Sequence, residues 1–124
     1  MAESVTIVEE KFGNSIEPVQ KIAFTWVSAA DGTATGQTTN PYTGEVIRLV
    51  TVPSGATAPT DDYDVIVNDE DTTDVLMGAG ADRDTANTEQ VLASSLGCVA
   101  NDKLTLEIAN AGDAKGGTVY LYIR

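Results

Sequence analysis

The residues with the clearest capacity for chemistry form one acidic segment, residues 61–84. It contains nine carboxylates and a single base, so it carries −8 of the chain's formal charge of −12. Hard cations such as Ca²⁺ bind several carboxylate oxygens, and Asp69 and Asp71 occupy the first and third positions of an EF-hand-like loop. The pattern then fails, because its sixth position is Asp74 instead of glycine and its twelfth is Gly80 instead of glutamate. We favour a solvated loop whose side chains bond their own backbone, with a different calcium site on Asp69, Asp71 and Asp74 as the alternative.

The inventory of nucleophiles and bases argues against an enzyme. The chain has no histidine, which excludes a Ser-His-Asp triad, a histidine zinc site and a histidine general base. A glycosidase needs a carboxyl group with a raised pKa, and the acids here lie in turns without apolar neighbours. The turn Gly78-Ala79-Gly80 lacks the lysine and helix of a phosphate loop, so it is interpreted as a mobile glycine turn. We predict no catalytic residues, no cofactor and no enzymatic activity.

The lone cysteine and the scattered bases narrow the partners further. Cys98 lies in an apolar stretch without a basic neighbour, which predicts a buried, inert thiol and excludes an intramolecular disulfide. The seven Lys and Arg residues are scattered singly against nineteen Asp and Glu, so no nucleic acid and no membrane surface is expected as a partner. The chain starts with an acid where a secretory leader needs bases, and its apolar runs are short. We therefore expect a protein made in the cytoplasm.

Alternating apolar residues predict that strands position these loops. The alternation recurs in seven stretches, which are residues 5–10, 20–27, 33–39, 45–52, 63–68, 103–108 and 118–124. Turn residues separate the stretches, and sixteen threonines and eleven glycines suit strands and turns. The single tryptophan, Trp26, shares a strand face with Ile22 and Phe24 and is expected in the core. Tyr120 and Tyr122 lie on the second face of the last stretch, so both faces of that strand are expected to be covered.

Length and pattern together predict one all-β domain over residues 1–124. The expected architecture is a β-sandwich or jelly roll of about seven to eight strands. At most one short helix or helical turn is expected, within residues 84–96, where Val91, Leu92 and Leu96 would share a helical face. Residues 1–19 are expected to form an N-terminal arm or an edge strand.

Six short segments form a characteristic set within about residues 20–124. They are NPYTGEVIR (40–48), APTDDYDV (58–65), DVLMG (74–78), ADRDT (81–85), NAG (110–112) and GTVYLYIR (117–124). As a set they resemble a group of small structural proteins of tailed bacteriophages that decorate or cement the capsid. The resemblance implies a non-enzymatic virion protein on the capsid surface that binds neighbouring subunits of the major capsid protein.

A cement protein needs a rigid scaffold and a contact face, and symmetric capsid positions favour a homo-oligomer, a trimer over a dimer. Two elements are candidate contacts: the strand 5–10, which could add to another sheet, and the loop 51–60. The candidate contact residues are Val5, Ile7, Thr51, Pro53 and Pro59. The acidic segment then either faces solvent or meets basic groups of the capsid.

The alternative is a ligand- or carbohydrate-binding β-sandwich module of a phage fibre or tail, assisted by calcium. Such a module needs exposed aromatic side chains beside a carboxylate cluster. The available tyrosines are Tyr42, Tyr63, Tyr120 and Tyr122, and strand alternation is expected to bury at least one of them. Calcium-dependent thermal stabilisation or glycan binding would favour this alternative.

Overall fold

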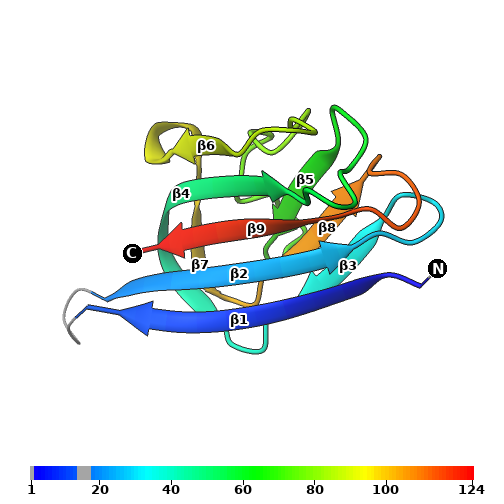
Figure 1. Cartoon of the computed structure of the whole chain (residues 1–124). Coiled ribbons are helices and arrows are strands. Elements are labelled where there is room, and N and C mark those ends of the chain that lie inside the picture. Colours follow the sequence, from blue (N-terminus) through cyan, green and yellow to red (C-terminus); the bar gives the residue numbers. More distant parts are fainter. Residues whose placement is uncertain (1, 14–17) are drawn as a thin grey trace.

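The computed structural model describes residues 2–13 and 18–124, and nine strands in that part form two antiparallel sheets stacked as a sandwich (Figure 1). The strands of the larger sheet are, in spatial order, β1 (Ser4–Phe12), β2 (Val19–Val27), β9 (Gly116–Ile123), β4 (Tyr42–Pro53) and β6 (Glu89–Leu92), with β7 (Cys98–Asp102) also paired to β4. The strands of the smaller sheet are β3 (Ala34–Gln37), β8 (Thr105–Ala109) and β5 (Asp64–Asn68). The predicted all-β sandwich is therefore confirmed, with nine strands in place of seven or eight.

The core lies between the inner faces of the two sheets, as the period-two alternation predicts. Alternate residues of β2 and β9 form one wall of it, and these fully buried residues are Ile22, Phe24, Trp26, Val119, Leu121 and Ile123. The Trp26 ring lies 5.6 Å, centroid to centroid, from the ring of Tyr63, the residue that precedes β5. Burial raises the pKa of Tyr63 to about 12, because the ionised phenolate would be poorly solvated there. The expected core position of Trp26 is confirmed.

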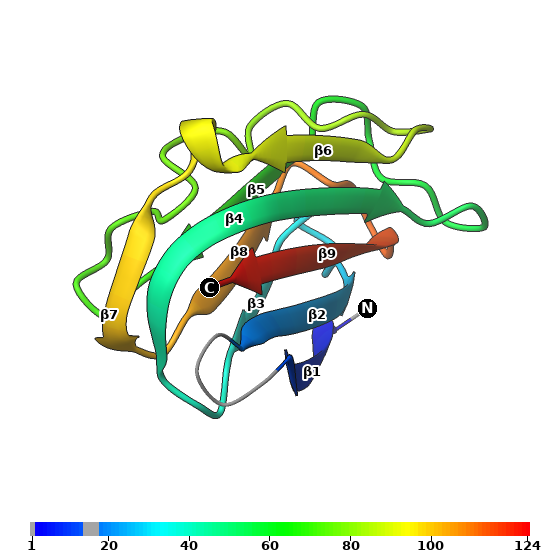
Figure 2. The ribbon, with the colours of Figure 1, turned by 90° about the vertical axis from the view of Figure 1, so that its left-hand side faces the viewer.

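The longest strand, β4, bends, and this lets two short strands share one of its edges (Figure 2). Its pairing register with β9 shifts between Val46 and Arg48, and such bulges bend a strand. Strand β7 pairs with β4 before the shift, at Tyr42 to Glu45, and β6 pairs with it afterwards, at Arg48 to Thr51. These two short strands are the ones that the sequence pattern did not reveal.

The helical turn expected within residues 84–96 is confined to η1 (Ala93–Ser95), a single 3-10 turn that follows β6. In β6, Val91 packs against the core while Leu92 is 68% exposed. The apolar residues of this window fit a helix or a strand equally well, and pairing with the open edge of β4 selects the strand. Within the described residues, no helix has the length and apolar character needed to span a membrane.

Candidate functional site

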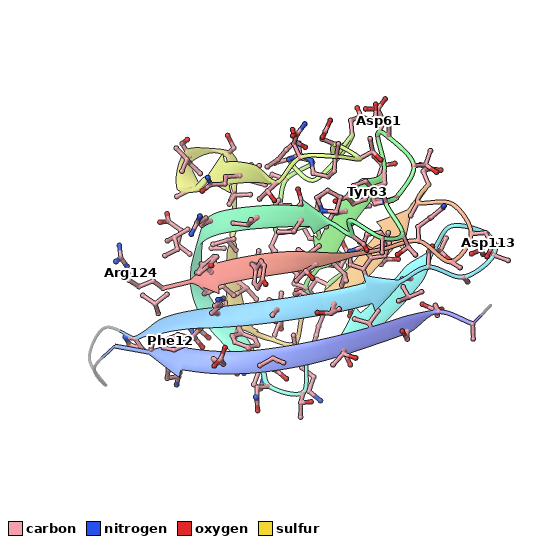
Figure 3. The ribbon with its side chains drawn as sticks, in the orientation of Figure 1. Phe12, Asp61, Tyr63, Asp113 and Arg124 are labelled. Carbon is pink, nitrogen blue, oxygen red and sulfur yellow. The ribbon has the colours of Figure 1, made fainter. Side chains whose placement is uncertain are left out.

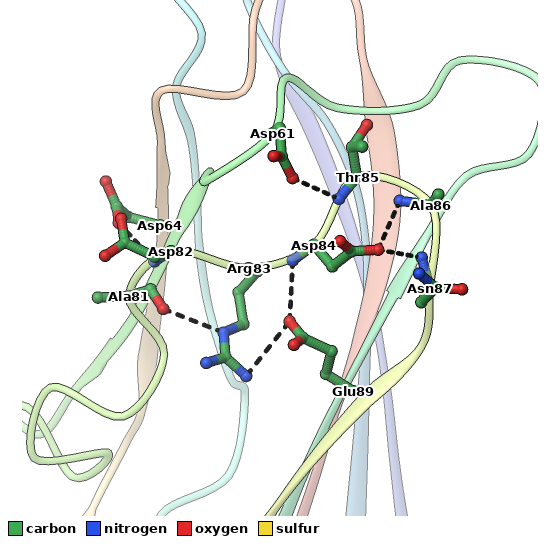
Figure 4. Close-up of polar contacts among 10 residues, drawn as sticks. All are labelled: Asp61, Asp64, Ala81, Asp82, Arg83, Asp84, Thr85, Ala86, Asn87 and Glu89. Atoms are coloured by element: carbon green, nitrogen blue, oxygen red, sulfur yellow. Dashed lines mark hydrogen bonds and ion pairs between the residues drawn. The ribbon is translucent and has the colours of Figure 1, made fainter.

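Most carboxylates at the start and end of the acidic segment accept hydrogen bonds from backbone amides of residues 82–87 (Figure 4). The Asp84 carboxylate accepts hydrogen bonds from the amides of Ala86 and Asn87, and these bonds hold the pKa of Asp84 below its usual value. Asp61 accepts a bond from the amide of Thr85 at 3.2 Å, and Asp64 accepts one from the amide of Asp82 at 3.0 Å. The predicted self-bonded loop therefore describes these carboxylates correctly.

The middle of the segment is organised by Asp74. Its Oδ1 accepts hydrogen bonds from the amides of Val67 and Leu76 at 3.2 and 3.0 Å, and its Oδ2 accepts one from Gly78 at 3.0 Å. Both oxygens are thus engaged with the backbone, and Asp74 lies outside the group formed by the other two calcium candidates.

The other two calcium candidates, Asp69 and Asp71, meet Asp102 of β7 instead of Asp74. One carboxylate oxygen from each of the three lies within 4.8 Å of the others. Asp69 Oδ1 already accepts hydrogen bonds from the amides of Asp71 and Thr73, at 2.9 and 3.0 Å. Asp69 is therefore part of a self-bonded turn, and the geometry of the trio assigns no metal.

The glycine turn within this segment is packed against β5 at Gly80, whereas Gly78 is exposed. Gly80 is buried, and its carbonyl accepts a hydrogen bond from the amide of Val65 at 2.8 Å. A Cβ atom at this position would lie 2.1 Å from the Val65 carbonyl oxygen. Glycine is required there because the loop backbone rests directly on β5.

One ion pair connects the acidic segment to β6. Arg83 Nη1 lies 3.7 Å from Glu89 Oε1, the single salt bridge among the described residues, and Glu89 Oε1 also accepts a bond from the amide of Asp84 at 2.8 Å (Figure 4). Asp62 and Asp82 differ from their neighbours, because neither side chain accepts a hydrogen bond from a described residue. The pKa of Asp62 is raised, above all by the charge of Asp61. Asp62 and Asp82 therefore present carboxylates that no described residue engages in a hydrogen bond.

The outer face of the larger sheet has no covering layer within the described residues, and it faces the viewer in Figures 1 and 3. Cross-strand pairing arranges its side chains in rows from β1 to β6. The first row consists of Glu10, Lys21, Tyr122, Arg48 and Leu92. The second row consists of Val8, Ala23, Tyr120, Val50 and Gln90. We call these two rows the open face.

The open face contains exposed apolar and aromatic side chains. Val8 is 50% exposed at the β1 side and Leu92 is 68% exposed at the β6 side, and between them Tyr120 and Tyr122 are half-buried. The sequence predicted that both faces of β9 would be covered, and this is wrong for the face that carries the tyrosines. Exposed apolar side chains therefore lie at both sides of the open face, with the two tyrosines between them.

Two cations lie over the tyrosine rings of the open face. Lys21 Nζ is 4.9 Å from the centroid of Tyr120 and 5.8 Å from that of Tyr122, and Arg48 Cζ is 5.1 Å from the Tyr122 centroid. Gln90 Oε1 accepts hydrogen bonds from Arg48 Nε at 3.0 Å and Nη2 at 2.7 Å, which fixes the guanidinium. No carboxylate of a described residue forms a salt bridge with either cation. The open face therefore presents two oriented positive charges.

Strand β1 forms one edge of the larger sheet, and its main chain pairs only with β2. The neighbouring edge of the smaller sheet differs, because carboxylates of β1 and of the residue before β1 bond amides of β3 and of the turn after β3. Glu3 accepts a hydrogen bond from the amide of Thr35 in β3, and Glu9 accepts bonds from the amides of Thr39 and Asn40 at 3.0 and 3.1 Å. Residues 4–12 are thus an edge strand, while residues 14–17 of the expected arm lie outside the described residues.

Glu9 also accepts a hydrogen bond from the Tyr42 hydroxyl at 2.7 Å. Partial burial alone would raise the pKa of Glu9, but the bonds from Tyr42, Thr39 and Asn40 outweigh this effect and lower the pKa. Burial of the Tyr42 side chain and, after it, the contact with Glu9 raise the pKa of Tyr42. Glu9 is therefore an ionised latch between β1 and the turn that precedes β4.

The sequence-based contact candidates differ in accessibility. Val5 and Ile7 are half-buried, because their side chains pack on the core and leave the main-chain edge of β1 open. Pro53 is half-buried at the end of β4, whereas Thr51 is 1% exposed on the inner face of that strand and Pro59 is buried. Thr51 and Pro59 therefore cannot contact a partner through their side chains.

The accessibility of Cys98 and of the tyrosines tests two further sequence-based expectations. Cys98 is exposed at the start of β7, so the predicted buried thiol is wrong. Among the four tyrosines, Tyr42 and Tyr63 are buried and cannot act as exposed platforms for a sugar.

Comparison with protein-family models, curated proteins and solved structures gives no match for this chain.

Proposed function

We propose that this chain is a structural protein of a tailed-phage virion, which attaches to the outer capsid surface and reinforces neighbouring major capsid subunits. The observation that carries the proposal is the open main-chain edge of β1. An edge strand with unpaired amides and carbonyls is a template for an extended segment of another protein. The resemblance of six segments to phage structural proteins names the class of partner.

The contrast between the two neighbouring sheet edges supports this use of β1. The edge of the smaller sheet is partly protected, because Glu3 engages the amide of Thr35 in β3, while Glu9 engages the amides of Thr39 and Asn40 in the turn after β3. The edge of β1 has nine residues, no proline and no such protection among the described residues. Natural proteins usually block long edge strands, so an unblocked one indicates a site where another strand adds.

The broad test is the composition of the particle. Mass spectrometry of purified virions encoding this chain should detect it in multiple copies, and electron microscopy should place it on the outer capsid. Absence from virions, or a position confined to the tail, would overturn the proposal. The test of the edge uses single proline substitutions in β1, because proline removes one main-chain donor.

Neighbouring residues of an antiparallel edge strand direct their amides alternately to the paired strand and to the open side. Of Thr6→Pro and Ile7→Pro, one therefore breaks a bond to β2 and lowers the melting temperature, and the other removes only an open-side donor. The proline variant that keeps a near-native melting temperature should lose capsid occupancy at least tenfold. Thr6→Ala and Ile7→Ala control for the side chains. Full occupancy of the stable proline variant would exclude strand addition at β1.

A further inference from the structure

The open face and the acidic segment have opposite local charges in the same chain. Among the ten residues of the two rows, only Lys21, Arg48 and Glu10 are charged, and their formal charges sum to +1. The net charge of the whole chain is −12, so the residues outside the rows sum to −13. In Figure 3 the open face is turned to the viewer, and Asp61 lies at the upper margin of the molecule. One copy therefore cannot cover its own open face with its acidic segment.

On both surfaces, charged side chains lack a partner of opposite charge within the described residues. Arg48 is fixed by Gln90 and both cations are seated on tyrosine rings, yet neither forms an ion pair with a carboxylate of a described residue. Among the acids, Asp62 and Asp82 accept no hydrogen bond from a described residue, unlike Asp61, Asp64 and Asp84. The chain thus presents unpaired cations on one surface and unpaired carboxylates on another.

A two-fold dimer through the open face is disfavoured by the same charges. An axis along β9 through Tyr122 would place Lys21 of one copy opposite Arg48 of the other. An axis across the strands would place each cation opposite its own counterpart. Both arrangements bring like charges together in a contact, which costs binding energy.

We propose that copies of this chain associate head to tail, with the open face of one copy binding the free carboxylates Asp62 and Asp82 of the next. This contact is heterologous, so it forms rings when the rotation between copies closes and chains when it does not. The inference goes beyond attachment to a capsid, which uses the β1 edge, and the two contacts are compatible because they use different surfaces.

The dimensions and the solution conditions permit such a contact. Five strands about 4.8 Å apart span roughly 19 Å across the sheet. All of them except the four-residue β6 have at least eight residues, so the sheet surface extends beyond the two rows. Stable interfaces bury about 800 Å² per partner, so the open face has to be used across most of its width. The general repulsion between two acidic chains is screened beyond a Debye length of about 8 Å at physiological salt.

The test uses two variants of the full chain that each retain one half of the contact. Lys21→Glu with Arg48→Glu reverses the charge of the open face, and Asp62→Asn with Asp82→Asn neutralises the free carboxylates. Asparagine is chosen because Asp62 and Asp82 have φ values of 65° and 54°, which asparagine tolerates. Lys103→Glu with Lys115→Glu is the control for charge reversal elsewhere.

Sedimentation equilibrium at physiological salt reads out the association, and circular dichroism verifies that every variant is folded. The wild type and the control should associate beyond the 13.0 kDa monomer, and each contact variant should associate at least tenfold more weakly. An equimolar mixture of the two contact variants should form a heterodimer, because one intact face meets one intact acidic segment.

A monomeric wild type, contact variants that associate like the wild type, or a mixture that stays monomeric would each overturn the head-to-tail contact. A symmetric contact between two open faces would give the second of these results, because Asp62→Asn with Asp82→Asn leaves the open face intact. The measurement involves no capsid, so its failure leaves the proposed function standing. Absence of the chain from virions would likewise leave the self-association result unaffected.

Discussion

The acidic segment and the open face show two different uses of charged side chains. In the acidic segment the carboxylates bond nearby amides, and Asp74 alone accepts three such bonds. On the open face the cations bond no backbone and pair with no carboxylate among the described residues. The segment with most of the charge therefore has mainly a structural role, while the sheet face with little charge has its charged groups free for a partner.

The difference corrects the intuition that the densest charge marks the site. A loop rich in aspartate provides many acceptors for amides that no strand satisfies. Four of the seven non-glycine residues with positive φ among the described residues lie in this segment: Asp62, Thr72, Met77 and Asp82. The backbone there departs from regular structure, and the aspartates compensate for the lost main-chain pairs. Asp62, Asp71 and Asp82 are the acids of this segment whose carboxylates accept no hydrogen bond from a described residue.

The greatest loss of stability is expected for Gly80→Ala. If the acidic segment is structural, its contact with β5 must be close, and an alanine Cβ would lie 2.1 Å from the Val65 carbonyl oxygen. The loop would have to move, at a cost of roughly 3 kcal/mol in the free energy of unfolding. Urea unfolding followed by tryptophan fluorescence measures this through Trp26.

Gly78→Ala is the matched control for crowding, because no atom lies within 4 Å of a Cβ at that position. Its positive φ of 82° still adds strain, so a smaller loss is expected there than at Gly80. If Gly80→Ala is neutral, the segment is a loosely attached loop, and the contrast with the open face disappears.

The sequence predicts the long strands of this fold because each has a buried inner face. Ile22, Phe24 and Trp26 recur at every second position of β2, and the structure buries all three. Strands β6 and β7 escape the same reasoning. They have four and five residues, and β6 alternates around Val91 alone, so pairing along the bent edge of β4 determines both. No local pattern contains that information.

The site is less predictable than the fold, for reasons of the same kind. Alternation places Tyr120 and Tyr122 on one side of β9, but it does not tell whether a layer covers that side. Lys21 and Arg48 are 27 residues apart in the chain, and they flank Tyr122 only because β9 lies between β2 and β4 in the sheet. Thr51 and Pro59 were predicted as contacts from their place in a turn-rich stretch, and the inward side of β4 and the packing of the loop bury them.

A medium effect is expected at Glu9, the acid of the larger sheet with the same structural use as those of the acidic segment. Its lowered pKa means that the ionised form stabilises the fold, fully above the ordinary value of 4.5 and progressively less as the pH falls through the folded-state pKa. Glu9→Gln should therefore lower the free energy of unfolding by about 1 kcal/mol at pH 7, after allowance for solvent screening.

The pH dependence distinguishes the latch from a packing contact. Thermal melts of the wild type and Glu9→Gln should differ at pH 7 and converge as the pH falls below 4.5, because the wild type then loses its ionised acceptor. Glu10→Gln, at the neighbouring position on the open face, is the control and should show no such convergence. A constant difference across the pH range would mean that the carboxylate charge of Glu9 has no part in holding β1.

The smallest effect on stability is expected at Lys21. In Lys21→Met the side chain keeps its contact with Tyr120 and Tyr122, and a favourable sulfur–aromatic contact replaces the cation–π interaction. The free energy of unfolding should therefore change by less than about 0.5 kcal/mol, the range for exposed positions. Self-association should nevertheless weaken, because half of the positive charge of the row is gone. A residue whose loss leaves the fold intact and impairs association acts in recognition, whereas a large drop in melting temperature would assign Lys21 the same structural role as the aspartates.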